Sequence, residues 1–195
     1  MAHDDPIAEF QDAFADARKR VEAPYDPTAC ALATADAEGR PSVRLVLLKQ
    51  VDARGFVFYT NYGSRKAQQL AENPWAALVF HWAPTARQVR VEGRAARVPA
   101  EESDAYFASR DHGSRIGAWA SKQSQPLPSR AHLVARAAKT EARFAGRPVP
   151  RPEFWGGYRL VPERMEFWWN QLHRLHDRLL YTREGGGWRV ERLYP

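Results

Sequence analysis

Short apolar segments with strand-like alternation recur along most of this 195-residue chain, and turns rich in glycine, proline or aspartate separate them. In residues 87–98, Val89 and Val91 stand between charged neighbours, a pattern typical of a half-exposed antiparallel strand. Few folds accommodate so many short, closely connected strands. The predicted strands cover residues 31–35, 42–51, 55–61, 75–82, 87–98, 154–169 (with a break at Pro162), 178–184 and 188–194.

Helical patterns occupy the gaps between these strands. Apolar residues at helical spacing in residues 5–21, behind Asp5-Pro6, predict an amphipathic N-terminal helix. Ser64 is expected to cap a second helix, which ends at Asn73-Pro74. The other predicted helices cover residues 100–109, about 114–121 and 130–145. We therefore expect a mainly β protein with α-helices, built as a closed or partly closed antiparallel barrel with peripheral helices.

Composition narrows the class of protein. The longest apolar runs fall short of the roughly 18 residues that a membrane-spanning helix needs. The N-terminal decapeptide is acidic and has no apolar core of a signal peptide, so we expect a cytoplasmic protein. Cys30 is the only cysteine and lies in an apolar stretch, which favours a small buried residue over a reactive thiol. P-loop, GxGxxG, GxSxG and CxxC patterns do not occur.

The positive charge comes mainly from arginine. The net charge is +6, with 24 arginines and 5 lysines. Arginine binds phosphate in two-pronged fashion, which suits nucleic acid or a small phosphorylated ligand, although a GC-rich genome also favours arginine everywhere. The arginines are scattered and no groove-reading motif occurs, so we expect no nucleic-acid partner.

Three polar groups could bind anions. Arg65 and Lys66 follow Gly63-Ser64 in the first turn of a predicted helix, where cations are unfavourable unless an anion is bound. Arg44 and Lys49 lie on opposite faces of a continuous strand, so they would serve two anions, unless one is an ordinary surface charge. The third group could equally be ordinary polar surface, and it contains Tyr106, Arg110, Ser114 and Arg115.

A fourth group combines aromatic rings with basic residues. Residues 167–169 are Phe-Trp-Trp, and residues 173–178 alternate histidine and arginine. Such a group could stack on a planar heterocycle and supply charge. His173, His176 and Asp177 alone make a weak metal site, because no second cluster supplies the remaining ligands, and we expect none. The alternative is a surface turn whose aromatic residues belong to the core.

Eight short motifs follow one another along the chain: RLVLLK (44–49), FYTNYGSRKAQQL (58–70), RQVRVEG (87–93), YFASR (106–110), SRIGAWASKQS (114–124), FWGGYRL (154–160), EFW (166–168) and RLHDR (174–178). In this order, they resemble the pyridoxine 5′-phosphate oxidase family over nearly the whole chain. The resemblance implies a single domain over residues 1–195 with an FMN-binding split-barrel fold, a helix and linker in residues 1–25, and residues 154–195 completing the flavin site. It also implies a homodimer with FMN at the subunit interface.

The resemblance assigns a role to individual residues. The FMN phosphate would be bound by Arg44, Arg65 and Lys66, within a cofactor-binding set that includes Leu45, Val46, Leu47, Leu48 and Lys49. Tyr59, Thr60 and Gln88 would contact the flavin, and the partner subunit would contribute Gln123, Ser124, Trp168 and Arg178. The substrate phosphate would be bound by Lys49, Tyr106, Arg110 and Ser114. The catalytic residues would be Arg174, which orients the pyridine ring, and His176.

The implied reaction oxidises pyridoxine or pyridoxamine 5′-phosphate to pyridoxal 5′-phosphate, with O2 as electron acceptor, H2O2 as product, and ammonia released from the amine. Two features depart from the family pattern. The substrate-covering N-terminal arm of many members is expected to be missing, and Trp169-Asn170 replaces Gln-Gly, which would put a bulky ring beside the flavin. The alternatives are a related flavin oxidase acting on another substrate, such as a phenazine precursor, and a non-enzymatic binder of FMN or pyridoxal phosphate.

Overall fold

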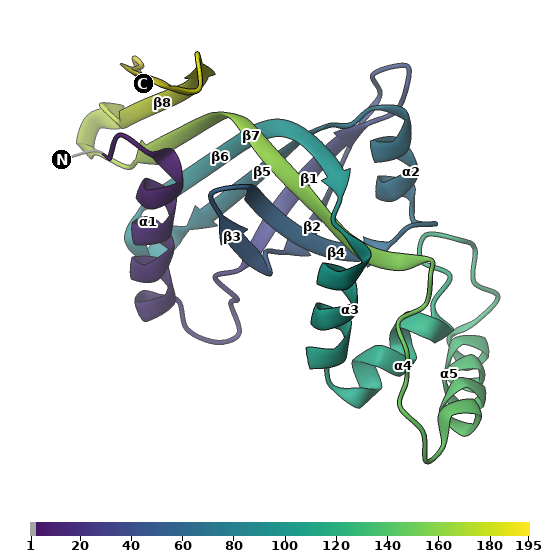
Figure 1. Ribbon diagram of the computed structural model, residues 1–195. Helices are drawn as coiled ribbons and strands as arrows, with labels where there is room; N and C mark the ends of the chain where they lie inside the picture. The colour runs from purple at the N-terminus through teal and green to yellow at the C-terminus, as the bar shows by residue number, and fades with distance from the viewer. Residues whose placement is uncertain (1–2) are drawn as a thin grey trace.

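The computed structural model describes residues 3–195, so the first two residues of the acidic N-terminal segment lie outside the description. Nine strands form one antiparallel sheet, in the order β2-β1-β5-β6-β7-β4-β3, with β8 paired to β7 and β9 to β8. Figure 1 shows the sheet strongly curved, with helices at its two ends. The strands are β1 (Ala29–Ala35), β2 (Pro41–Leu47), β3 (Gln50–Asp52), β4 (Gly55–Asn61), β5 (Trp75–Trp82), β6 (Arg87–Arg97), β7 (Trp155–Trp169), β8 (Asp177–Glu184) and β9 (Gly187–Arg192).

The two edges of the main sheet, β2 and β3, are consecutive in the chain, and the chain passes directly from one to the other. Leu48 N–H donates to Thr28 O beside β1, whereas Lys49 N–H donates to Val57 O in β4. The predicted continuous strand over residues 42–51 was therefore wrong. Because the strand is interrupted there, the opposite-face argument for Arg44 and Lys49 does not hold.

Helix α1 (Pro6–Arg20) covers the main core. Asp5 caps it by accepting a hydrogen bond from Ile7 N–H, and Pro6 occupies the first turn, where no N–H is needed. Phe10 is fully buried, with its ring centroid 4.8 Å from that of Phe56 and 4.9 Å from that of Phe80. The N-terminal helix was thus predicted correctly, and its apolar face forms part of the core.

The other helices gather at the opposite end of the molecule, apart from α2, which lies beside β1 (Figure 1). One predicted boundary was wrong: helix α4 begins at His112 rather than near residue 114, and the Asp111 side chain caps it by accepting from Ser114 N–H. The preceding helix ends at Ser109, with Arg110 as its C-cap residue. The helices are α2 (Arg65–Glu72), α3 (Ala100–Ser109), α4 (His112–Ala120) and α5 (Arg130–Phe144), with short 3-10 turns at Ala83–Thr85 and Leu172–Arg174.

Strand β7 runs unbroken through Pro162, where a break was predicted. The ladder with β6 shifts register between Glu92 and Gly93, and Gly93 lies opposite Pro162. A bulge of this kind accommodates a proline, which has no N–H to donate to the ladder. A Cβ on Gly93 would lie 2.0 Å from Val161 O, so only glycine fits there.

The mainly antiparallel, partly closed barrel with peripheral helices confirms the predicted fold class. Within the described residues, no helix combines the length and apolar character that crossing a membrane requires. Cys30 is buried, as expected, and desolvation raises the pKa of its thiol to about 12.

Candidate functional site

A cleft of about 430 Å³ opens where β2, β4, α3 and α4 meet. Leu45, Val46 and Leu47 line it from β2, and Lys49 from the crossing between β2 and β3. Leu48, from the same predicted set, is buried in the core and does not line the cleft. The remaining lining residues are Tyr59, Thr60, Asn61, Lys66, Tyr106, Arg110, Ser114, Gly117, Ala118, Ser121, Gln123 and Trp155.

Lys66 forms the floor of one end of this cleft. Its side chain is 8% exposed, and Nζ lies 3.2 Å from both Thr60 Oγ1 and Gln123 Oε1. Burial and the nearby charge of Arg44 lower the pKa of Lys66 to about 8. Gln123 therefore reaches this site from the same chain, whereas we expected it from the partner.

Arg44 and Arg65 add two further cations near Lys66. The Arg44 guanidinium donates to Thr34 Oγ1 at 2.6 Å, and burial followed by the charge of Arg65 lowers its pKa. Arg65 is exposed at the start of α2. Within residues 3–195, none of the three cations is paired with a carboxylate. Three like charges without a counter-ion fit a bound anion such as a phosphate group.

Ser64 occupies the N-cap position of α2, but its side chain makes no capping hydrogen bond. Instead its fully buried hydroxyl lies 3.4 Å from Thr60 Oγ1 and 3.5 Å from Lys66 Nζ. Ser64 is therefore at the predicted N-cap position, but its side chain does not make the predicted capping hydrogen bond. The hydroxyl belongs to the same polar group as Lys66.

Three aromatic rings, of Tyr59, Tyr106 and Trp155, also line the cleft. The Tyr59 ring stacks on Tyr106, with centroids 3.9 Å apart and planes 17° apart, and its centroid is 5.4 Å from that of Trp155. The Arg110 guanidinium lies over the Trp155 ring at 4.7 Å. A Cβ on Gly157 would lie 2.9 Å from the Tyr59 ring, so this glycine leaves the space that the stack occupies.

Arg110 has donors without acceptors. Its Nη1 atom is buried and makes no hydrogen bond, and the same is true of Arg115 Nε. Buried polar atoms are nearly always paired, so an unpaired guanidinium donor indicates a missing acceptor. The four residues expected to bind the substrate phosphate, Lys49, Tyr106, Arg110 and Ser114, all line this cleft.

A second group of predicted residues lies at the far end of β7. Gln88, Trp168 and Arg178 are direct neighbours across β6, β7 and β8. The His176 ring centroid lies 4.5 Å from that of Trp168. Arg178 Nε donates to Glu166 Oε1 at 2.8 Å, which raises the pKa of Arg178.

Arg174, one of the two expected catalytic residues, lies in the turn before β8 and is exposed. Its φ is +61°, and His173 beside it has a φ of +56°. Two consecutive non-glycine residues in this region are uncommon, and such strain is concentrated at functional sites. Ser124, with φ +71°, is exposed in the loop after α4 and does not line the cleft.

The two groups do not meet within one chain. Trp155, which lines the cleft, is the first residue of β7, whereas Trp168 is the last but one residue of that strand. Figure 1 shows the long course of β7 between them. A strand rises about 3.3 Å per residue, so their separation is up to roughly 40 Å. No residue of the second group lines the cleft.

Trp169 does not face the second group. Neighbouring strand residues point to opposite faces, and Trp169 stacks on Phe167 and packs against the main core. Trp169 therefore points away from Trp168, the ring that was expected to contact the flavin, and it contributes to core packing.

Sequence reasoning missed several residues of the site. Thr34 and Gln69 are buried and hold the Arg44 guanidinium, and Asn61 donates to Ser121 O at 3.2 Å. The sequence did offer one sign of Thr34: it is a polar residue within the otherwise apolar strand of residues 31–35. Trp155 was inside a matched motif, but only packing shows that it stacks on Tyr59.

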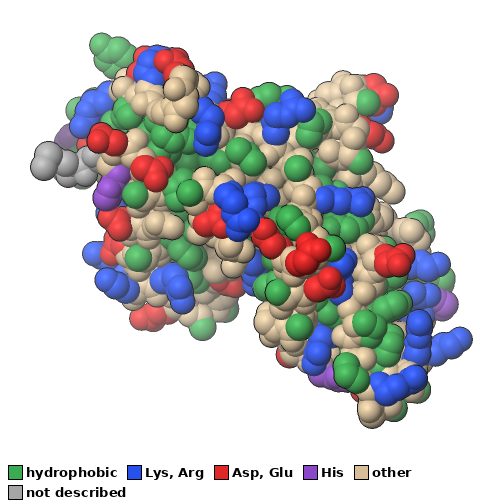
Figure 2. Space-filling model, viewed as in Figure 1, with side chains coloured by type: hydrophobic (Ala, Val, Ile, Leu, Met, Phe, Trp, Pro, Cys, Tyr) green, Lys and Arg blue, Asp and Glu red, His purple; other side chains and the backbone are tan. Residues whose placement is uncertain are grey.

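A larger cavity, about 810 Å³, adjoins the cleft and shares Asn61, Ser121 and Gln123 with it. Lys122, Arg136, Lys139 and Arg143 line its rim, and α5 contributes three of them. Figure 2 shows the corresponding concentration of basic side chains at the lower right, over α5. Among the described residues, no group of three or more histidine, cysteine or acidic side chains could hold a metal ion.

The curved antiparallel sheet with its peripheral helices places the chain in the class of split-barrel proteins, and cations line its cleft. Residues 16–144 match the family model described as pyridoxamine 5′-phosphate oxidase. Residues 155–195 match the pyridoxine 5′-phosphate oxidase C-terminal dimerisation region. The chain belongs to the pyridoxine/pyridoxamine 5′-phosphate oxidase family.

Individual relatives agree with this assignment. A pyridoxine/pyridoxamine 5′-phosphate oxidase of Rubrobacter xylanophilus is 59% identical over 194 residues, which cover 100% of this chain and 88% of the relative. One from Anaeromyxobacter dehalogenans is 58% identical over 98% of this chain and 96% of its own.

Solved structures show the same fold. PhzG from Burkholderia lata 383, in complex with tetrahydrophenazine-1-carboxylic acid, superposes with a TM-score of 0.93 at 37% identity, over 99% of this chain and 94% of its own. A pyridoxamine 5′-phosphate oxidase-related, FMN-binding protein from Nostoc punctiforme has a TM-score of 0.77 at 19% identity over the whole of both chains. The second likeness concerns the fold alone.

Proposed function

We propose that this protein is an FMN-dependent oxidase that converts pyridoxine or pyridoxamine 5′-phosphate to pyridoxal 5′-phosphate. The observation that carries the proposal is a cleft with cations at two places. Lys66 lines it at one place, with Arg44 and Arg65 close behind, and Lys49 and Arg110 line it at the other, where Arg110 Nη1 is buried without a partner. A phosphorylated cofactor and a phosphorylated substrate require two such groups in one site.

Each group has its own task in this proposal. Lys66, Arg44 and Arg65 hold the FMN phosphate, with Thr60 and Gln123 orienting the Lys66 ammonium. The unpaired Nη1 donor of Arg110 binds the substrate phosphate together with Lys49, Tyr106 and Ser114. Bound FMN supplies the electron acceptor for oxidation of the substrate carbon, and O2 reoxidises it with formation of H2O2. The protein contributes orientation and charge.

The second group of residues, Gln88, Trp168, Arg174, His176 and Arg178, completes the site from the partner subunit in this proposal. Its distance from the cleft along β7 supports this arrangement, because a single FMN cannot span it. The edge strand β2 also leaves Val43 and Leu45 69% and 73% exposed, which suits burial by a second copy. Residues 1–195 acting as one flavin-binding domain, and a cytoplasmic location, remain predictions from the sequence.

The direct test is formation of pyridoxal 5′-phosphate by FMN-loaded protein in air, followed by absorbance with peroxide measured in parallel. We expect steady product from pyridoxine or pyridoxamine 5′-phosphate, with about one H2O2 per turnover. Protein that binds FMN but oxidises neither compound would overturn the proposal and favour a binding role.

A related oxidase acting on a phenazine precursor is the second candidate, because the similar PhzG structure holds tetrahydrophenazine-1-carboxylic acid. Unphosphorylated pyridoxine and a reduced phenazine carboxylic acid would be offered to the same preparation. Faster turnover of the phenazine than of the vitamin phosphates would favour this candidate. The unpaired donor of Arg110 supports the phosphorylated substrate instead.

A further inference from the structure

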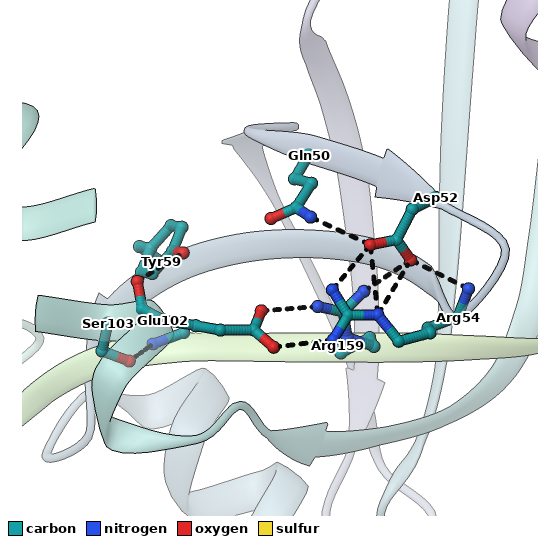
Figure 3. Close-up of polar contacts among 8 residues, drawn as sticks. Gln50, Asp52, Arg54, Tyr59, Glu102, Ser103 and Arg159 are labelled. Atoms are coloured by element: carbon teal, nitrogen blue, oxygen red, sulfur yellow. Dashed lines mark hydrogen bonds and ion pairs between the residues drawn. The ribbon is translucent and has the colours of Figure 1, made fainter. Parts of the chain in front are cut away.

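Four charged residues form a closed ring beside the cleft, on the face of the sheet that α3 covers (Figure 3). Arg159 Nη1 donates to Asp52 Oδ1 at 2.9 Å, and Nη2 donates to Glu102 Oε2 at 2.6 Å. Arg54 closes the ring, with Nη2 at 2.8 Å from Asp52 Oδ2 and Nη1 at 2.9 Å from Glu102 Oε1. Each carboxylate thus has two guanidinium partners.

The ring joins segments that are distant in the sequence. Asp52 belongs to β3, Arg54 to the turn after it, Glu102 to the first turn of α3, and Arg159 to β7. Arg159 lies within the sheet, between Val57 of β4 and Ala96 of β6. Its side chain is only 10% exposed, whereas that of Arg54 is 58% exposed. Arg159 is therefore the buried centre of the ring.

Both carboxylates of the ring lie close in the chain to residues that line the cleft. Lys49 immediately precedes β3, three residues before Asp52. Tyr106 is one helical turn beyond Glu102 on α3, and Arg110 ends that helix. In addition, Tyr59 OH donates to the backbone oxygen of Glu102 at 3.3 Å. Movement of α3 relative to β3 would change the spacing between Lys49 and Arg110.

Stability alone does not explain a buried arginine at this position. Removing charges from water costs free energy, and a buried ion pair often stabilises no more than well-packed apolar residues would. What the ring provides is a defined geometry, because two bonds from one planar guanidinium set the spacing of the two carboxylates. Hydrogen bonds from Arg54, together with the charge of Arg159, lower the pKa of Asp52 to about 2.

We propose that Arg159 is a positioning residue for the substrate-phosphate site: by binding Asp52 and Glu102 together, it sets the spacing between Lys49 on one side and Tyr106 and Arg110 on the other. Arg159 touches neither ligand itself. The inference rests on the proposed function, since it takes these residues as the substrate-phosphate set. The Lys66 end of the cleft is outside the ring, so FMN affinity is expected to stay constant.

The test compares Arg159→Met, Arg159→Lys and a control, Arg164→Met, which removes an exposed arginine from the same strand. Each is measured as FMN-loaded protein for kcat and KM with pyridoxine 5′-phosphate, and for FMN affinity by fluorescence. Calorimetric binding of pyridoxal 5′-phosphate gives a readout that does not need turnover.

For Arg159→Met we expect KM and the pyridoxal 5′-phosphate Kd to rise roughly tenfold or more, because displaced phosphate ligands bind poorly, with FMN affinity within about twofold of the wild type. Arg159→Lys should recover part of the loss, and Arg164→Met should match the wild type. Unchanged KM and Kd in Arg159→Met would overturn the inference, as would an equal loss of FMN affinity, which indicates general unfolding of the cleft. If Arg159→Met does not fold, Arg159→Lys decides by the same criteria.

The two proposals fail in different ways. Wild-type protein that oxidises neither vitamin phosphate overturns the proposed function, and the Kd comparison still decides the role of Arg159. Wild-type turnover with an unchanged Arg159→Met KM overturns the positioning role alone.

Discussion

Lys66 carries its charge where no described carboxylate balances it. Its ammonium group is surrounded by a hydroxyl, an amide oxygen and another cation, Arg44. Burial favours the neutral amine, which explains why the pKa of Lys66 falls from 10.5 to about 8. A bound phosphate dianion would favour the charged form instead. Ligand binding and protonation of this one side chain are therefore coupled.

This coupling predicts how pH affects FMN binding. Above pH 8 the ligand-free protein loses the Lys66 proton, so FMN affinity should fall by up to about tenfold per pH unit between pH 8 and 9.5. Phosphate ionisation does not interfere, since the second pKa of a phosphate monoester is about 6. In Lys66→Met we expect weaker binding at pH 7 and a flat profile above pH 8, measured by quenching of flavin fluorescence.

Lys19→Met, which removes an exposed lysine from α1, is the matched control and should keep the wild-type profile. The lowered pKa of Lys66 also makes the free energy of unfolding depend on pH. Between pH 8 and 10.5 the unfolded state binds more protons at Lys66 than the folded state does, so its contribution raises the free energy of unfolding as pH rises. An identical pH profile in Lys66→Met and the wild type would contradict the assignment.

Helix α1 contributes to the fold mainly through one ring. Phe10 is completely buried and contacts Phe56 and Phe80 in edge-to-face geometry, with Trp82 at 5.8 Å. The helix therefore closes the core on that side of the sheet. The intrinsic helix propensity of α1 contributes less to stability than this packing does, since an isolated helix of this length is marginally stable in water.

Phe10→Ala should lower the free energy of unfolding by about 3–5 kcal/mol, because the removed ring leaves a cavity that rigid aromatic neighbours cannot fill. Urea denaturation at one fixed protein concentration measures the change, since dimer stability depends on concentration. The exposed neighbour Gln11→Ala is the control and should change stability by less than about 0.5 kcal/mol. A Phe10→Ala loss as small as that of the control would mean that α1 is not part of the cooperative core.

In the whole molecule, strand β7 separates the two halves of the proposed site. Its first residues adjoin the cleft and its last residues carry Trp168, in register with Gln88 and Arg178. A two-fold dimer can bring the start of one β7 strand near the end of the other. Each site would then contain residues of both chains.

This arrangement predicts subunit complementation. Lys66→Met and Arg174→Ala should each be inactive as homodimers. Mixed by co-refolding, they should recover about a quarter of wild-type activity, because half of the dimers are mixed and each has one intact site. The control mixes Lys66→Met with Lys19→Met/Lys66→Met, which should recover nothing. Absence of recovery from mixed dimers that are shown to form would place both halves of the site in one chain.

Most of the strands and helices, and the residues that we propose bind phosphate, could be predicted from the amino-acid sequence. Alternating apolar residues and helix signals depend on neighbours a few positions away, so they can be read locally, as for β4, β5 and α1. The motifs around Lys66 and Arg110 likewise name residues whose chemistry suits phosphate.

How these residues come together depends on long-range contacts in the folded chain. The crossing at Leu48 and Lys49 depends on a switch of hydrogen-bond partners from β1 to β4, and local alternation cannot reveal such a switch. The direction of Trp169 depends on the pleat of β7, and the partners of Arg159 lie 57 and 107 residues away in the chain. These contacts arise from closure of the sheet, a long-range event that no short window of sequence contains.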